Sequence, residues 1–201
     1  MFRFLFVFLA AITFAVAAEP LTPQSIATGI LAPLLDPVKV ATLRGDRPAN
    51  ARLYKVLGWL ETARQAGGDV DEIIDTAQAT AGYEGTKGAN ADKLAIRWSR
   101  TKLEDFGCFT EEGMVKLKKG GSPTIMKGEH AGSGIMLDHV LPRAIVPELA
   151  ARFYNLEAVA AKVNLQKSAK IGNRELLLAR RWKDDGLLSA EGLQAIEAVA
   201  R

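Results

Sequence analysis

The chain has 201 residues, of which 48% are hydrophobic and 24% are charged, and its formal net charge at pH 7 is +3. This length is sufficient for one domain with a buried core, or for one domain with an attached helical layer. Cys108 is the only cysteine, which excludes an internal disulfide. Because Phe106 and Phe109 flank it, we expect Cys108 to be a buried thiol and not a redox centre.

Residues 1–18 have the features of a secretory signal peptide. Arg3 precedes an apolar run from Phe4 to Ala18, and the small residues at the end of this run suit cleavage near Ala18. The run is shorter than the roughly twenty apolar residues that a membrane span needs, which favours cleavage over a retained anchor. We therefore expect a periplasmic or secreted mature protein that has no stable association with the membrane.

Residues 19–121 are predicted to form a helical amino-terminal region. Apolar residues at helical spacing indicate one helix that passes through Leu60 and stops at Gly67. A second helix begins after Asp69, which is a good N-cap residue, and a third is expected from about Asn90.

A short helix is expected after Thr110, with Gly120 at its end. In the same region Tyr54, Trp59 and Trp98 are interpreted as packing residues in preference to platforms for stacked bases.

Residues 122–172 are predicted to form a separate functional core that begins with strands. The strand-like segments Thr124–Lys127 and Ile135–Asp138 are joined by a glycine-rich stretch, which indicates a β-hairpin. Glu129 and His130 lie near its turn. They are candidates for contact with a metal or substrate, with an ordinary polar turn as the alternative.

A compact group of polar residues follows this predicted hairpin. The chain reads Leu137-Asp138-His139-Val140-Leu141-Pro142, then Asn155-Leu156, then Asn164-Leu165-Gln166-Lys167. In order and spacing, this segment resembles the HNH (ββα-metal) endonuclease family. The resemblance covers about residues 124–172. It implies a strand ending in Asp-His, a loop, an Asn at the head of a second strand, and then a helix.

The resemblance also implies a role for each polar residue of the segment. His139 would be the general base, and Asp138 and Asn164 would bind the metal ion. Asn155 would steady the histidine or the connecting loop, and Lys167 would contact a phosphate oxygen. A histidine is suited to this role because it titrates near neutrality and can accept a proton from water.

The local pattern fits these implied roles. Asp138 and His139 are adjacent, so a regular strand would direct them to opposite faces, and Pro142 with Arg143 is compatible with a bend just beyond. Asn164 and Lys167 are three residues apart, which places them on one face of a helix. Arg143 is a further candidate for substrate contact.

The expected cofactor is one divalent metal ion. A carboxylate beside a neutral amide oxygen favours a hard cation, and Mg²⁺ or Mn²⁺ best fits such ligands. Many HNH proteins also carry Cys-x-x-Cys pairs for a structural zinc. Ala160 and Val163 occupy the place of one such pair here, so no structural zinc is expected.

The charge is distributed unevenly along the chain. From Glu19 to Gly113 there are 11 Lys or Arg against 14 Asp or Glu, whereas Met114 to Lys183 holds 13 against 5. The basic part is the part that contains the motif. Such a bias suits attraction to the phosphates of nucleic acid, although an ordinary solvated surface has the same composition.

Residues 173–201 are expected to form two carboxy-terminal helices, capped by Asn173 and Ser189, that pack on the core. The predicted fold class is therefore α+β, a mainly helical domain that contains a ββα-metal motif.

The predicted function is a metal-dependent endonuclease of low sequence specificity whose partner is DNA, with RNA as a further substrate. A first alternative is a non-catalytic periplasmic protein that holds nucleic acid or an anionic polymer on a basic ββα scaffold. A second is a secreted antibacterial toxin, which would need a delivery domain that the sequence does not reveal. No motif identifies a protein partner.

Overall fold

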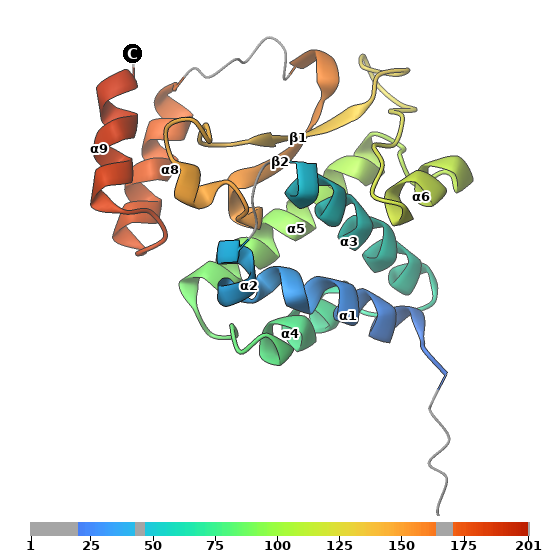
Figure 1. Ribbon diagram of the computed structural model, residues 1–201. Helices are drawn as coiled ribbons and strands as arrows, with labels where there is room; N and C mark the ends of the chain where they lie inside the picture. The colour runs from blue at the N-terminus through green and yellow to red at the C-terminus, as the bar shows by residue number, and fades with distance from the viewer. Residues whose placement is uncertain (1–19, 43–46, 164–170, 201) are drawn as a thin grey trace, which may run out of the picture.

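The computed structural model describes residues 20–42, 47–163 and 171–200. Over these ranges the chain is mainly helical and carries a small two-stranded antiparallel sheet (Figure 1). This arrangement agrees with the predicted α+β class. None of the helices in the described ranges combines the length and apolar character needed to cross a membrane.

A layer of helices precedes the sheet. These are α1 (Pro23–Leu35), α2 (Pro37–Thr42), α3 (Arg47–Gln65), α4 (Val70–Thr80), α5 (Lys87–Asp105) and α6 (Glu111–Lys118). Helix α1 packs against α3 and α4, and α3 also packs against α6, while α5 contacts β2 and the turn before it. The sheet therefore lies on one side of this helical layer (Figure 1).

The helix caps explain most of the boundaries in this layer. As predicted, Asp69 caps α4 by accepting hydrogen bonds from two backbone N–H groups, and Thr110 caps α6. Helix α5 begins earlier than the predicted Asn90. The Thr86 hydroxyl accepts a 3.0 Å hydrogen bond from the N–H of Ala89, so this threonine is the N-cap and Lys87 the first helical residue.

The sheet consists of β1 (Ile135–His139) and β2 (Leu156–Ala160), paired from Ile135↔Ala160 to His139↔Leu156. The loop between the strands contains two short 3₁₀ helices, η1 (Pro147–Leu149) and η2 (Phe153–Asn155). Residues 161–163, directly after β2, are helical.

The predicted hairpin between Thr124–Lys127 and Ile135–Asp138 forms only in part. The Ile125 N–H donates to the Ser133 carbonyl at 2.8 Å and the Ile135 N–H to the Pro123 carbonyl at 3.2 Å, but the ladder of β1 is with β2. The first segment contributes a single isolated bridge, Thr124↔Gly134. Beyond it, the N–H groups of Met126 and Lys127 donate to the carbonyl of Phe106, at 2.8 and 3.1 Å. Since those donors are used by the turn after α5, they cannot extend a ladder with β1.

The buried apolar residues form two clusters. The first joins the amino-terminal helices to the sheet and includes Leu57, Ile96, Ile135 and Leu137. The second joins the loop after β1 to the carboxy-terminal helices α8 (Asn173–Asp184) and α9 (Ala190–Val199). Its members are Val140, Leu141, Val146, Leu149, Tyr154, Ile171, Ala179, Trp182, Leu188 and Ile196. The chain thus passes from one cluster to the other at His139.

The cap of α8 differs from the prediction by one residue. Gly172 is the N-cap, and its N–H donates a 3.0 Å hydrogen bond to the carboxylate of Glu175, so Asn173 is the first helical residue. Ser189 caps α9 as predicted, accepting from the N–H of Gly192 at 2.9 Å.

Three of the four predicted packing residues are confirmed, and one is not. Trp59 is partly buried against the amino-terminal cluster. Cys108 and Tyr54 are buried, and burial raises the pKa of the Cys108 thiol to about 11, which disfavours a reactive thiolate. Trp98, in contrast, is 55% exposed. More than half of this side chain is open to solvent, so its packing role was wrongly predicted.

Candidate active site

Asn155 joins the two ends of the loop between β1 and β2. Its side chain is completely buried. The amide oxygen accepts a 2.8 Å hydrogen bond from the N–H of Leu141, and the amide nitrogen donates to the carbonyls of Leu141 and Leu149, at 3.1 and 3.3 Å. One side chain at the head of β2 therefore fixes the chain just after β1 and the far part of the loop.

His139 is the last residue of β1, and its ring is held by the same loop. Its Nε2 lies 3.0 Å from the carbonyl oxygen of Ala150. A carbonyl can only accept a hydrogen bond, so Nε2 must carry the proton. In the neutral ring the lone pair is then on Nδ1, the nitrogen able to accept a proton from water.

The bend predicted after the strand is present. The N–H groups of Ile145 and Val146 both donate to the carbonyl of Pro142, at 2.9 and 3.0 Å. This turn follows directly on the Leu141 backbone that Asn155 holds. Arg143 lies within the turn and is exposed.

Asp138 lies on the opposite face of β1 from His139. Its direct cross-strand partner is Glu157, so the two carboxylates share one face of the sheet. Arg174, in the first turn of α8, binds Glu157 through two hydrogen bonds of 3.2 and 2.7 Å. The hydrogen bond to Glu157 raises the pKa of the Arg174 guanidinium, which therefore remains a fixed positive charge next to this pair of acids.

Glu129 and His130 are not brought to this end of the strand. They lie in the turn that precedes β1, whereas Asp138 and His139 end it (Figure 1). The two residues contact each other, with 3.0 Å between the His130 Nε2 and the Glu129 carboxylate. A polar turn, the alternative considered from the sequence, describes them better than a contact with the metal or substrate.

Asn164 and Lys167 lie outside the described residues, so their predicted roles remain predictions. The carboxylate of Asp138 has the oxygen donors that a hard divalent cation prefers. No cluster of three or more His, Cys, Asp or Glu side chains arranged for a metal occurs among the described residues.

A buried carboxylate that was not predicted from the sequence accepts a hydrogen bond from the loop. Asp92 on α5 is buried, and its Oδ1 accepts a 2.9 Å hydrogen bond from the backbone N–H of Tyr154. Burial raises the pKa of Asp92 to about 7, an effect that this hydrogen bond and the charge of Arg152 oppose. Asp92 thus connects α5 to the residue immediately before Asn155.

The sequence contained a signal for this residue. The buried positions of α5 recur at helical spacing, and they are Ala89, Asp92, Ile96, Ser99 and Leu103. A carboxylate within an otherwise apolar or small stripe indicates a buried charge that needs partners.

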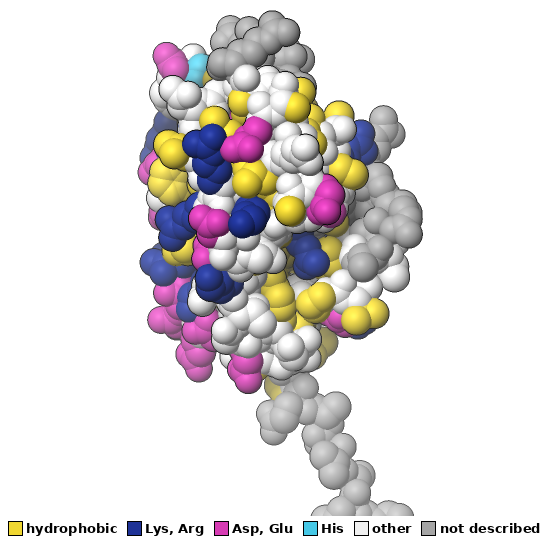
Figure 2. Space-filling model, turned by 90° about the vertical axis from the view of Figure 1, so that its left-hand side faces the viewer, with side chains coloured by type: hydrophobic (Ala, Val, Ile, Leu, Met, Phe, Trp, Pro, Cys, Tyr) yellow, Lys and Arg dark blue, Asp and Glu magenta, His cyan; other side chains and the backbone are white. Residues whose placement is uncertain are grey.

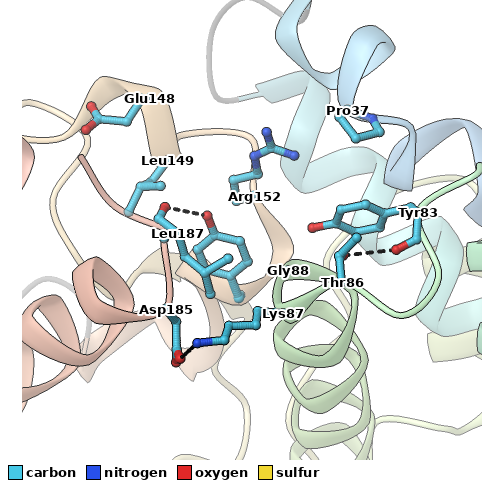
Figure 3. A pocket seen from close by; sticks show the side chains of 12 residues that line it. Pro37, Tyr83, Thr86, Lys87, Gly88, Glu148, Leu149, Arg152, Asp185 and Leu187 are labelled. Atoms are coloured by element: carbon cyan, nitrogen blue, oxygen red, sulfur yellow. Dashed lines mark hydrogen bonds and ion pairs between the residues drawn. The ribbon is translucent and has the colours of Figure 1, made fainter.

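A cavity of about 440 Å³ opens next to this buried group (Figure 3). Arg152 and Tyr83 line it, and burial raises the pKa of the Tyr83 hydroxyl. At its edge, Lys87 Nζ lies 2.7 Å from Asp185 Oδ1, so an ion pair connects α5 to the end of α8.

The predicted basic surface is largely neutralised along α8. Arg174 binds Glu157, Arg180 binds Glu197 at 2.9 Å, and Arg181 lies 3.8 Å from Asp185. Figure 2 shows basic, acidic and hydrophobic side chains interspersed on this side of the molecule. This face therefore has no single continuous basic patch among the described residues.

Comparisons of the chain with known protein families, with curated proteins and with solved structures found no match. The function proposed below therefore depends on this chain's own motif and on the geometry around it.

Proposed function

We propose that this protein is a periplasmic or secreted HNH-type endonuclease that hydrolyses phosphodiester bonds in DNA, with RNA as a further substrate, at low sequence specificity. The main support is the Asn155 side chain, which binds both ends of the loop that positions the His139 ring. This is the role that the resemblance gives to the middle Asn. A loop fixed in this way holds a base in one orientation before substrate arrives.

His139 would act as the general base. With Nε2 donating to the Ala150 carbonyl, Nδ1 takes a proton from the attacking water. The water oxygen then forms a bond to phosphorus while the bond from phosphorus to the 3′ oxygen breaks, and the leaving oxygen is protonated by solvent. The products are a 5′ phosphate and a 3′ hydroxyl.

Asp138 and Asn164 would hold one divalent cation, Mg²⁺ or Mn²⁺, whose charge offsets the negative charge developing on the phosphate and the leaving oxygen. Glu157 is adjacent to Asp138, but Arg174 already occupies its carboxylate. The resemblance assigns the metal to Asp138 among the described carboxylates, and Lys167 would contact a phosphate oxygen.

The proposal is tested by cleavage of supercoiled plasmid and of single-stranded RNA by the mature protein with Mg²⁺, with Mn²⁺ and with EDTA. We expect metal-dependent nicking that His139→Ala abolishes, because the variant lacks the group proposed to take the proton from water. Nucleic-acid binding should be largely retained in that variant.

The chain offers a matched control, because His130 is its only other histidine. His130→Ala should cleave at the wild-type rate, since His130 pairs with Glu129 in the turn before β1. Equal loss of activity in both variants would contradict the assignment. A folded protein that binds nucleic acid but never cleaves it would instead favour the non-catalytic binding protein.

A further inference from the structure

A second cavity, of about 590 Å³, lies between α5 and α8 and carries an exposed aromatic side chain. One wall is formed by Leu94 and Trp98, four residues apart on α5, which are 65% and 55% exposed. The other wall is formed by Leu178 and Trp182, four residues apart on α8. We refer to this cavity as the α5–α8 groove.

The groove adjoins the candidate active site. Its lining includes Val140, which follows His139, and Leu156, which follows Asn155. Glu157, the cross-strand partner of Asp138, also lines it. A ligand bound in the groove would therefore be next to the end of the sheet that the motif occupies.

The rim of the groove carries one more cation than acid. Lys87, Arg174 and Arg181 line it together with two acids, Glu157 and Asp185. The cations form ion pairs with these acids, yet their side chains remain 64%, 57% and 80% exposed, respectively. Solvent-exposed cations around an apolar floor suit a ligand that is anionic on one side and apolar on the other.

Trp98 has the environment of a stacking platform. The Lys102 ammonium lies 4.8 Å from the centre of its ring, a cation–π contact that orients the ring and places a positive charge beside it. Aromatic side chains flanked by cations bind unpaired bases, because every base offers a flat π face and a phosphate close by.

We propose that the α5–α8 groove binds an unstacked base of single-stranded nucleic acid, with the base against Trp98 and its phosphate near Arg174 or Arg181. This inference rests on the proposed action on nucleic acid and adds a strand preference to it. A base within a duplex is stacked on its neighbours and cannot present its face to the ring, so single strands or frayed ends should bind more tightly than duplex.

The test measures binding in EDTA, so that cleavage cannot contribute. Fluorescence anisotropy would follow an end-labelled oligothymidylate of about ten nucleotides, a length within the range of single-strand sites, and a duplex of the same length. We expect tighter binding of the single strand, and about tenfold weaker single-strand binding in Trp98→Ala. Trp98→Phe, which keeps a ring, should bind with intermediate affinity.

Trp59 provides the matched control. It is a partly buried tryptophan with Lys118 5.4 Å from its ring centre, but it does not line the groove. Trp59→Phe should bind both oligonucleotides as the wild type does. The oligonucleotide should also quench tryptophan fluorescence in the wild type and in Trp59→Phe, and less so in Trp98→Phe.

The outcomes separate this proposal from the nuclease proposal. Unchanged single-strand binding in folded Trp98→Ala, equal weakening for duplex, or no wild-type binding of the single strand would overturn the groove proposal, even if the protein cleaves plasmid. Weaker binding by Trp98→Ala that is confined to the single strand would support the groove proposal, even if the protein cleaves no substrate.

Discussion

The carboxylate of Asp92 and the backbone N–H of Tyr154 form a buried 2.9 Å hydrogen bond between α5 and the turn that precedes β2. This contact connects the amino-terminal helical layer to the loop that holds His139. The helices before the motif therefore contribute to the candidate site by positioning it.

Asp92→Ala should destabilise the protein, because it leaves the Tyr154 N–H buried without an acceptor. The expected loss in the free energy of unfolding is about 1–3 kcal/mol. Urea denaturation followed by circular dichroism would measure it. Asp75→Ala is the control, since the Asp75–Lys93 pair is at the surface and should change stability by less than about 1 kcal/mol. Equal effects in the two variants would argue that the Tyr154 contact is unimportant.

The pKa of Asp92, raised by burial to about 7, should also make stability depend on pH. An unfolded aspartate titrates near pH 4, so between about pH 4 and pH 7 the folded state binds the additional proton. The stabilisation is complete below that range and is lost as the pH rises through the folded-state pKa. We expect the free energy of unfolding of the wild type, measured relative to Asp92→Asn, to fall across this interval. A difference that is constant with pH would contradict the shift.

Asn155→Ala should lower both stability and cleavage. It removes three hydrogen bonds and leaves the buried N–H of Leu141 without its partner, a loss of about 1–3 kcal/mol or more. Plasmid nicking should be reduced even under conditions where the variant is folded, because the loop that bears Ala150 is no longer fixed. Asn155→Asp is an informative companion: its carboxylate can still accept from Leu141 but cannot donate to Leu149. Full activity in Asn155→Ala would exclude a positioning role.

Arg174→Ala should alter the metal requirement of the proposed nuclease. Removing the guanidinium leaves Glu157 without its bidentate partner, on the same face as Asp138. The added negative charge should strengthen cation binding, so the Mg²⁺ concentration that gives half-maximal cleavage should fall. Arg180→Ala is the control on the same helix, because Arg180 pairs with Glu197 at a distance from the sheet. A requirement that is unchanged, or raised, in Arg174→Ala would contradict this account.

Local signals in the sequence were sufficient for much of the helical layer. The caps Asp69, Thr110 and Ser189 were predicted correctly because a cap depends on a few neighbouring residues. The motif likewise placed a strand end at His139 and a second strand just after Asn155.

Features that depend on distant contacts were not predictable in this way. The strand-like segment at Thr124–Lys127 forms only a single bridge, because the Phe106 carbonyl, from another element, accepts the hydrogen bonds of Met126 and Lys127. The acceptor role of Asp92 depends on Tyr154, more than sixty residues away. The exposure of Trp98 likewise depends on the groove between α5 and α8, which local spacing does not specify.

At His139 the chain passes from one apolar cluster to the other, so the candidate site depends on both clusters. Ile135 and Leu137 anchor one side of this residue in the amino-terminal cluster, and Val140 and Leu141 anchor the other in the cluster of α8 and α9. Melting or proteolysis of either cluster would release the imidazole from its carbonyl before the remaining half unfolds. Any cleavage activity should therefore disappear ahead of the bulk helical signal during gradual denaturation.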